Sequence, residues 1–501
     1  QWKLAGTTAL AALVAGNAAL ADVTPEQVWE NWKGLVTSYG QTLTTENETR
    51  SGDTLVIGGV VMLSEQDGAR AEVAIDQITL RDAGDGSVQI TMSDDYQMTM
   101  NIPNEGEEKP TAITVSISNP DLSVRASGSA DEARYDYTAP EISIALDSVD
   151  GVDAKTLGID VSVTLNGSEG NSIVSGTGNT SMSTNFGATA MAVLANFVDP
   201  EGKSTLKGSV SLADLAVIST GSLPGGTNLS DMAAALNAGF VTEGAMTYGK
   251  TTFAFDFAEG VQTAQGQGAA ESGSLNFAMN KSRLAYGGGA KTVAVTVSGS
   301  DIPFPEVAFG YAESAFNFLM PVSKSDAPED FALMSKIVGL TISDDIWGLF
   351  DPAAVLPRDP VTLIIDTKGK GKLGVDLLDQ QAMAALGDTP PGELYALDLS
   401  ELKLIVAGAE VTGSGALTFD NSDKVSFEGL PAPTGTVTMN ASGLNGLIDK
   451  LVQMGLMPED QLAGMRMMLG MFAKPGGGAD TLTSTLEFKN GGFFANGMQL
   501  K

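Results

Sequence analysis

Residues 159–165 read IDVSVTL, so Ile159, Val161, Val163 and Leu165 alternate with polar side chains. Successive side chains of a β-strand point to opposite faces, and a period of two therefore predicts a strand with one buried face. The same period occurs earlier in the chain, in residues 73–80, 88–92, 98–102, 113–117 and 142–146. We therefore predict an antiparallel meander that begins near Thr54 and has one buried face.

Dipeptides typical of turns separate several of these runs, namely Asp85-Gly86, Asn119-Pro120 and Asn166-Gly167. We expect each of them to join two strands. Residues 166–185 and 259–274 are rich in Gly, Ser, Thr, Asn and Gln, a composition that indicates loops or exposed edge strands.

Three lysines, Lys368, Lys370 and Lys372, alternate with glycine and would share one face of a strand. Such a row suits a charged edge strand that blocks aggregation. The alternative is a patch for a lipid headgroup or an acidic partner.

Helices are predicted around the strands. Residues 24–27, TPEQ, combine an N-cap threonine, a proline at the first helical position and a capping-box glutamine. Trp29 and Trp32 follow, and we expect them to pack this helix onto a sheet instead of binding a ligand. Further helices are predicted at residues 231–238, 328–338, 343–350, 444–454 and 458–472.

The predicted fold class is mainly β with peripheral helices. The strands would form either an extended, strongly curved antiparallel sheet or two stacked β units, with an apolar groove as a further expectation. The predicted divisions are a signal peptide at 1–21, an N-terminal helix and antiparallel β meander at 22–230, a middle β region at 231–325, and a C-terminal β region with two helical pairs at 326–501.

Residues 1–21 resemble a signal peptide. Lys3 precedes an apolar run from Leu4 to Val14, and small residues follow it up to Ala21. Ala19 and Ala21 supply the small side chains that a signal peptidase accepts, so we expect cleavage after Ala21 and export to the periplasm. A retained membrane anchor is the alternative, but the apolar run is short for a spanning helix. No later stretch reaches that length, so we expect no transmembrane segment in the mature chain.

Composition excludes several classes of function. The chain has 61 Asp and Glu against 28 Lys and Arg, a net charge of −33, and nucleic acid is therefore an unsuitable partner. It contains no Cys and no His, which excludes thiol nucleophiles, Ser-His-Asp triads and histidine-ligated metals. We expect no cofactor and no bound metal, and no catalytic residues are assigned. With so many carboxylates, paired acids alone cannot identify a hydrolase.

One block of sequence resembles a known family. Residues 321–325 (PVSKS), 342–352 (ISDDIWGLFDP) and 356–360 (LPRDP) are similar to the hallmark of a largely alphaproteobacterial family catalogued as domain of unknown function 2125. The resemblance implies an exported envelope protein and carries no established activity. The motif residues to which we give a structural role are Trp347, Phe350, Asp351, Pro352, Pro357, Arg358 and Asp359.

These motif residues also have a physical interpretation. We expect Ser343 to cap a short helix, Trp347 and Phe350 to point to a core, and Asp351-Pro352 to end the helix. Arg358 would form a local ion pair at the entry to the next strand, a role that we favour over ligand binding.

A looser resemblance links residues 397–419 and 486–497 to strand repeats of AsmA-like envelope proteins, whose curved sheets enclose an apolar groove and are associated with lipid movement. The leading hypothesis is thus a non-enzymatic periplasmic protein that binds or carries a lipid or another hydrophobic ligand against inward-facing apolar side chains. The alternatives are a structural or assembly scaffold, which would contact other envelope proteins, and a carboxylate-based hydrolase.

Overall fold

The computed structural model describes residues 22–66, 68–104, 109–129, 131–176, 179–227, 229 and 231–501. The signal-peptide prediction concerns residues 1–21 and lies outside this range. The chain divides into two compact units. Unit 1 holds the described residues up to Ser272 together with Ser298–Pro303, and unit 2 holds Gly273–Val297 and Phe304–Lys501.

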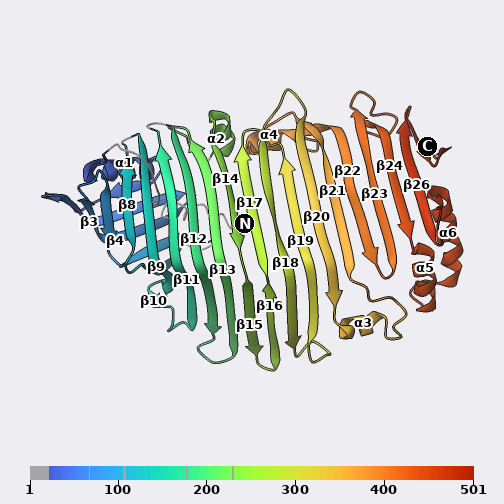
Figure 1. The fold of residues 1–501 in the computed structure, drawn as a ribbon, viewed down its shortest axis with the longest axis horizontal. Coiled ribbons are helices and arrows are strands. Elements are labelled where there is room, and N and C mark those ends of the chain that lie inside the picture. Colours follow the sequence, from blue (N-terminus) through green and yellow to red (C-terminus); the bar gives the residue numbers. More distant parts are fainter. Residues whose placement is uncertain are drawn as a thin grey trace. The chain divides into compact units, whose positions relative to one another are not determined.

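Unit 1 contains two helices and the first strands of the chain (Figure 1). They are α1 (Pro25–Ser38), β1 (Thr42–Thr44), β2 (Asn47–Ser51), β3 (Thr54–Gln66), β4 (Ala69–Asp82), β5 (Val88–Met92), β6 (Asp95–Ile102), β7 (Thr111–Ser118), β8 (Ser123–Gly128), β9 (Glu132–Val149), β10 (Val152–Asp153), β11 (Ile159–Ser175), β12 (Thr180–Val198), β13 (Ser204–Leu223), α2 (Met232–Ala238), β14 (Val241–Tyr248), β15 (Thr251–Glu259) and β16 (Gln262–Ala270).

Unit 2 contains the later strands and four helices, with most of β17 and β18 belonging to it. They are β17 (Ser272–Asn280), β18 (Arg283–Gly299), β19 (Val307–Met320), β20 (Glu329–Ile342), α3 (Asp344–Phe350), β21 (Val361–Leu373), α4 (Gln380–Leu386), β22 (Gly392–Val406), β23 (Ala409–Asp420), β24 (Ala432–Ser442), α5 (Leu444–Gln453), α6 (Glu459–Phe472), β25 (Lys474–Pro475), β26 (Thr481–Lys489), β27 (Gly492–Ala495) and β28 (Met498–Gln499).

The predicted fold class is confirmed, because the described chain is mainly β with antiparallel pairing and its helices lie at the periphery. Within unit 1 the strands follow one another as a meander. β5 and β6 both pair with β4, and β7 and β8 both pair with β9, so each of these pairs forms one interrupted line. Asn119-Pro120 lies in such an interruption and does not reverse the chain, whereas Asp85-Gly86 does turn between β4 and β5.

A line of interrupted residue pairs crosses the sheet of unit 1, and we call it the crease. Gly59 on β3, Gly167 on β11 and Asp214 on β13 each interrupt the regular pairing, with φ of 60°, 57° and 51°. The register is the same on both sides of each interruption, so one residue is skipped on both strands and neither strand gains a residue over its partner. The prediction of a turn at Asn166-Gly167 is therefore wrong, since β11 continues through it and the chain turns only after Ser175.

The crease changes which residues face inward. On β3, Ile57 precedes Gly59 and Val60 follows it, yet both side chains are buried in the same core. An undisturbed strand would send an odd-numbered and an even-numbered residue to opposite faces. The interruption therefore shifts the alternation by one residue on β3, and on β4 too, where Ile75 and Ile78 are both buried. Apolar side chains stay on one face along the whole strand.

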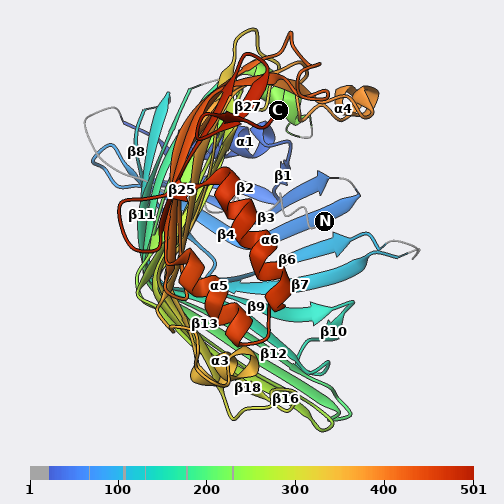
Figure 2. The same cartoon turned by 90° about the vertical axis from the view of Figure 1, so that its right-hand side faces the viewer.

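Helix α1 packs on the inner face of unit 1, and its predicted capping box is confirmed, with the Thr24 hydroxyl and the Gln27 amide oxygen accepting from backbone N–H groups. Trp29 and Trp32 are buried in the core, and the Trp29 indole N–H donates to Glu48 Oε1 at 2.8 Å. The prediction that both tryptophans pack the helix onto the sheet is confirmed. Figure 2 shows strands of unit 1 bending toward the side on which α1 lies.

Two predictions about residues of unit 2 are wrong. Residues 328–338 do not form a helix, because β20 occupies Glu329–Ile342 and pairs with both β19 and β21. The lysine row is on β21, which has a partner strand on each side, so it is not a charged edge. Lys370 Nζ instead forms an ion pair with Asp330 Oδ1 at 2.8 Å.

Helices α2, α3, α5 and α6 form where they were predicted, whereas α4 (Gln380–Leu386) was not predicted. Among the described residues, no helix combines the length and the apolarity that crossing a membrane requires.

The crease can be tested at Gly167. We expect Gly167→Ala to lower the free energy of unfolding by roughly 1–2 kcal/mol, because a Cβ is disfavoured at positive φ and would come within 2.7 Å of Thr189 Oγ1. Urea unfolding measures the change. The matched control is Gly187→Ala on the neighbouring strand, where an added Cβ makes ordinary contacts. Equal effects of the two substitutions would contradict a special role for the crease.

The core of unit 1 also predicts a sensitivity to alkali. Burial raises the pKa of Tyr96 from 10.0 to about 12 and raises the pKa of Tyr137 as well. The buried neutral phenol of Tyr96 therefore stabilises the fold fully below pH 10.0, and this contribution of roughly 2–3 kcal/mol is lost as the pH rises toward about 12. Spectrophotometric titration with far-ultraviolet dichroism should show delayed tyrosine ionisation together with unfolding. Tyr96→Phe should move the alkaline midpoint upward, and ionisation of every tyrosine at the ordinary pKa without unfolding would contradict this.

Candidate functional site

The inner face of unit 1 continues beyond α1 as an uninterrupted apolar surface. Tyr96 and Ile117 belong to the core against α1, Ile117 lies opposite Ile144, and Ile144 lies opposite Val163. Directly opposed residues of neighbouring strands place their side chains on the same face. The row then continues through Val193 and Val210 to Phe253.

Parallel rows complete this surface, which we call the apolar face. It consists of Ile159, Val161, Val163 and Leu165 on β11, Met191, Val193, Ala195 and Phe197 on β12, Leu206, Gly208, Val210 and Leu212 on β13, and Thr251, Phe253, Phe255 and Phe257 on β15.

None of these residues is charged. The face extends about 20 Å along the strands and roughly 15 Å across them, from the usual rise and strand spacing.

The apolar face is open to solvent at several positions. Phe197, Leu206 and Val210 are 41%, 39% and 37% exposed. Helix α1 makes most of its contacts with β1, β3 and β4, at the other end of the meander, and Trp32 also packs against Tyr135 of β9. Large apolar side chains that stay this exposed on contiguous strands mark a site of interaction, because burying them is favourable.

The opposite face of the same strands is mostly polar. Asp160, Ser162 and Thr164 alternate with the apolar residues of β11, and Ser209 and Ser211 do so on β13. Most of the exposed apolar side chains thus lie on one side, with Val198 on the other, and the sheet is amphipathic in this region.

Carboxylates lie where the apolar face ends. Asp199 comes two residues after Phe197, and Glu259 comes two residues after Phe257 and lies opposite Ser204. The Asp199 N–H donates to the Ser204 carbonyl at 2.9 Å, which joins the two strand ends. We call Asp199, Ser204 and Glu259 the rim.

A cavity of about 260 Å³ opens at this end of the apolar face. Its lining combines Ile159, Phe197, Leu206 and Phe257 from the last apolar row with Asp199 and Ser204 from the rim. Apolar and charged residues therefore line the same cavity.

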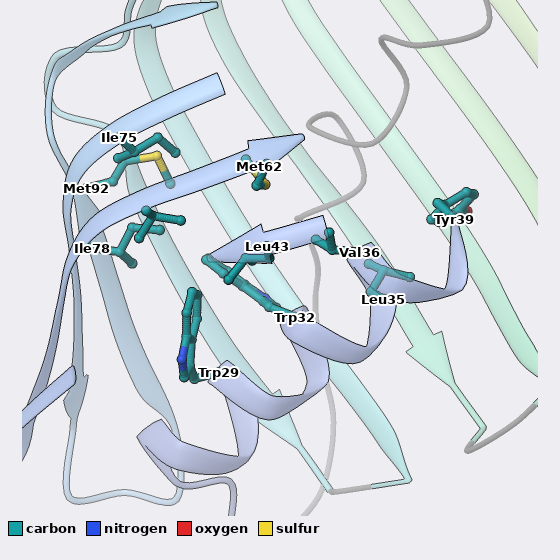
Figure 3. A pocket seen from close by; sticks show the side chains of 11 residues that line it. Trp29, Trp32, Leu35, Val36, Tyr39, Leu43, Met62, Ile75, Ile78 and Met92 are labelled. Carbon is teal, nitrogen blue, oxygen red and sulfur yellow. The ribbon is translucent and has the colours of Figure 1, made fainter. Parts of the chain in front are cut away.

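A second, smaller hollow of about 40 Å³ lies between α1 and strands β3 and β4 (Figure 3). Trp29, Trp32 and Tyr39 border it from the helix side, and Met62 and Ile75 from the strand side. Burial raises the pKa of Tyr39. The hollow is too small for a lipid chain, and it is part of the packing of α1.

Unit 2, taken by itself, also exposes apolar side chains on its strands. Tyr286, Phe318 and Leu333 lie opposite one another on β18, β19 and β20, and they are 44%, 37% and 52% exposed. Among the residues that the structure describes, no cluster of three or more Asp or Glu side chains could hold a metal ion.

The motif residues of unit 2 gather around α3. Trp347 is buried, its ring centroid lies 5.0 Å from that of Phe350, and the Phe350 side chain is 42% exposed. Ser343 is the N-cap residue, but its hydroxyl accepts from the Ala308 N–H and makes no capping bond. Asp351 ends the helix as predicted and is 1% exposed.

Asp351 organises the loop that follows α3. Its carboxylate oxygens accept from the Val355 N–H at 2.9 Å and from the Leu356 N–H at 2.8 Å. Pro352 is exposed next to it.

Arg358 forms the local ion pair that the sequence predicts. Its Nη1 donates to Asp344 Oδ1, and its guanidinium carbon lies 5.9 Å from the centre of the Trp347 ring. Pro357 lies against Gly408, where an added Cβ would come within 3.1 Å of Pro357 Cγ, and Asp359 is exposed. These contacts within the chain fit the expected structural role.

Sequence reasoning expected inward-facing apolar residues but missed the apolar face and the rim as a site. The alternation was readable, but the alignment of the apolar rows depends on the register of β11 with β12, of β12 with β13 and of β13 with β15. The signal that could have indicated the rim is an acid two residues beyond the last aromatic residue of a strand, as in Phe197 to Asp199 and Phe257 to Glu259.

Comparison with known proteins supports the family resemblance. Residues 348–500 match the model of a family described as "Uncharacterized protein conserved in bacteria (DUF2125)". The resemblance predicted from the motif residues is thereby confirmed over this range. Neither a curated protein nor a solved structure matched the chain. The description names no activity, so it transfers no catalytic or binding residues.

The structural role of Asp351 predicts a loss of stability on substitution. We expect Asp351→Ala to lower the free energy of unfolding by roughly 2–4 kcal/mol, because the Val355 and Leu356 N–H groups lose a charged acceptor in a buried position. Thermal unfolding of the purified protein measures this. Asp345→Ala, which changes an exposed carboxylate in the first turn of α3, should cost less than about 1 kcal/mol. An Asp351→Ala protein as stable as the control would rule out this role.

Proposed function

We propose that this protein is a non-enzymatic, exported component of the bacterial envelope that binds the acyl chains of a lipid on the apolar face of unit 1. The observation that carries the proposal is an uncharged surface over four adjacent strands on which Phe197, Leu206 and Val210 remain more than a third exposed. Binding an acyl chain would remove this surface from water, a gain proportional to the apolar area covered.

The dimensions of the apolar face suit an acyl chain. The hydrocarbon core of a bilayer is about 30 Å thick, so a chain within one leaflet spans roughly 15 Å. The apolar rows extend about 20 Å along the strands, which accommodates such a chain in an extended form. Uncharged Gly208 and Ala195 among larger residues leave shallow places where a flexible chain can settle.

The sequence indicates the cellular compartment in which the proposed binding would take place. Residues 1–21 indicate export, and the mature chain has no predicted membrane-spanning segment. Envelope lipids are then the apolar molecules nearest to the folded protein. An assembly scaffold, the runner-up, would need its sheet faces filled by its own side chains, and the exposed Phe197, Leu206 and Val210 favour a ligand over such filling.

A substitution on the apolar face tests the proposal. We expect Val210→Asp to weaken binding of a fluorescent long-chain fatty acid at least about tenfold, because a carboxylate in an apolar contact carries a large desolvation cost. Val210 is 37% exposed, so the fold should tolerate the change. Equilibrium fluorescence titration of the protein expressed without residues 1–21 gives the affinity.

The matched control is Ser209→Asp, which adds the same charge to the opposite face of β13 and should leave the affinity unchanged. Native mass spectrometry of protein purified from its own envelope should also detect bound lipid. Absence of copurifying lipid together with no binding of the fatty acid would refute the proposal, as would equal affinities for Val210→Asp and the unsubstituted protein.

A further inference from the structure

At the end of the apolar face lie phenylalanines and acidic residues, and the acidic residues have no role in burying acyl chains. Strands β12 and β15 each present a phenylalanine in the last apolar row and an acid two residues further on. By strand alternation, Glu259 is on the same face as Phe257. Asp199 lines the same cavity as Phe197, Phe257 and Ser204. The rim thus places carboxylates at the border of an aromatic hollow.

The charges near the rim are mainly negative. The β12–β13 hairpin carries Asp199 and Glu201 against a single cation, Lys203, which forms an ion pair with Glu201. Glu259 ends β15, and the whole chain has a net charge of −33. An anionic headgroup would be repelled here, whereas a positively charged group would be attracted.

The aromatic residues add a second preference for a cation. A ring face attracts an ammonium group within about 6 Å of its centre, and quaternary ammonium ligands are recognised in this way. Phe197 and Phe257 both line the cavity, and Phe197 is 41% exposed. Ser204 supplies a hydroxyl that can donate to a phosphate oxygen.

We infer that the rim binds the headgroup of a lipid that carries an ammonium group next to its phosphate, as in phosphoethanolamine and phosphocholine lipids, while the acyl chains lie on the apolar face. This inference rests on the proposed function and names its ligand class. Asp199 and Glu259 attract the ammonium group, Phe197 and Phe257 contact it, and Ser204 meets the phosphate. The rim therefore selects zwitterionic lipids against anionic ones.

The test compares lipids that differ only in the headgroup. Phosphatidylethanolamine, phosphatidylcholine, phosphatidylglycerol and diacylglycerol, with identical chains and the same acyl fluorophore, are titrated into the mature protein. We expect the two zwitterionic lipids to bind about fivefold more tightly than phosphatidylglycerol at low salt, and the difference to shrink as salt rises. The double variant Asp199→Asn, Glu259→Gln should lose this preference while its affinity for diacylglycerol stays unchanged.

The matched control is Asp160→Asn with Asp256→Asn, which removes the same charge from the outer face of β11 and β15 and should keep the preference. Equal affinities for all headgroups, or a preference that survives in the rim variant, would overturn the inference while binding of diacylglycerol still upheld the proposed function. Failure of every lipid, diacylglycerol included, to bind would instead refute the proposed function itself.

Discussion

The structure of unit 1 depends on the antiparallel ladder of long strands with an interrupted residue pair near the middle. A β-strand alternates its side chains strictly, so a strand as long as β11 or β13 needs an unbroken apolar alternation to keep one face buried. Gly59, Gly167 and Asp214 each lie in a skipped residue pair, at which the alternation resets while the register is kept. All apolar residues before and after the crease can then share the inner face, on which both the core and the apolar face are built.

The two halves of the inner face differ in how far their apolar side chains are covered. Near the start of the meander, α1 covers it with Trp29 and Trp32, and the covered strands carry fully buried Ile57 and Leu80. Further along, β12, β13 and β15 present side chains of the same type, and in the part of the chain that the structure describes Val210 and Phe197 remain exposed. The second region is thus the one to which we assign binding under the proposed function.

The sequence predicted local features well and long-range features poorly. The capping box at Thr24 and the alternation around Val163 are readable because both are set by neighbouring residues. Asn166-Gly167 was misread because glycine at positive φ occurs at an interruption inside a strand as well as in a turn. Residues 328–338 were misread because a helix-start signal at Pro328 is overridden by the pairing of β20 with two strands. The rim could not be predicted, since it requires the register that places Glu259 opposite Ser204.

The motif residues and the binding surface have separate tasks in this interpretation. Asp351 and Arg358 make their contacts to nearby backbone and side chains of unit 2, and these contacts fix a loop. A face such as that around Val210 has no directional group, so it distinguishes ligands only by their apolar area and shape. Chemical selectivity then has to come from polar groups at its border. Under the proposed function these groups are Asp199, Ser204 and Glu259 in unit 1, and the two carboxylates, more than the pattern of apolar residues, decide which lipid headgroup is preferred.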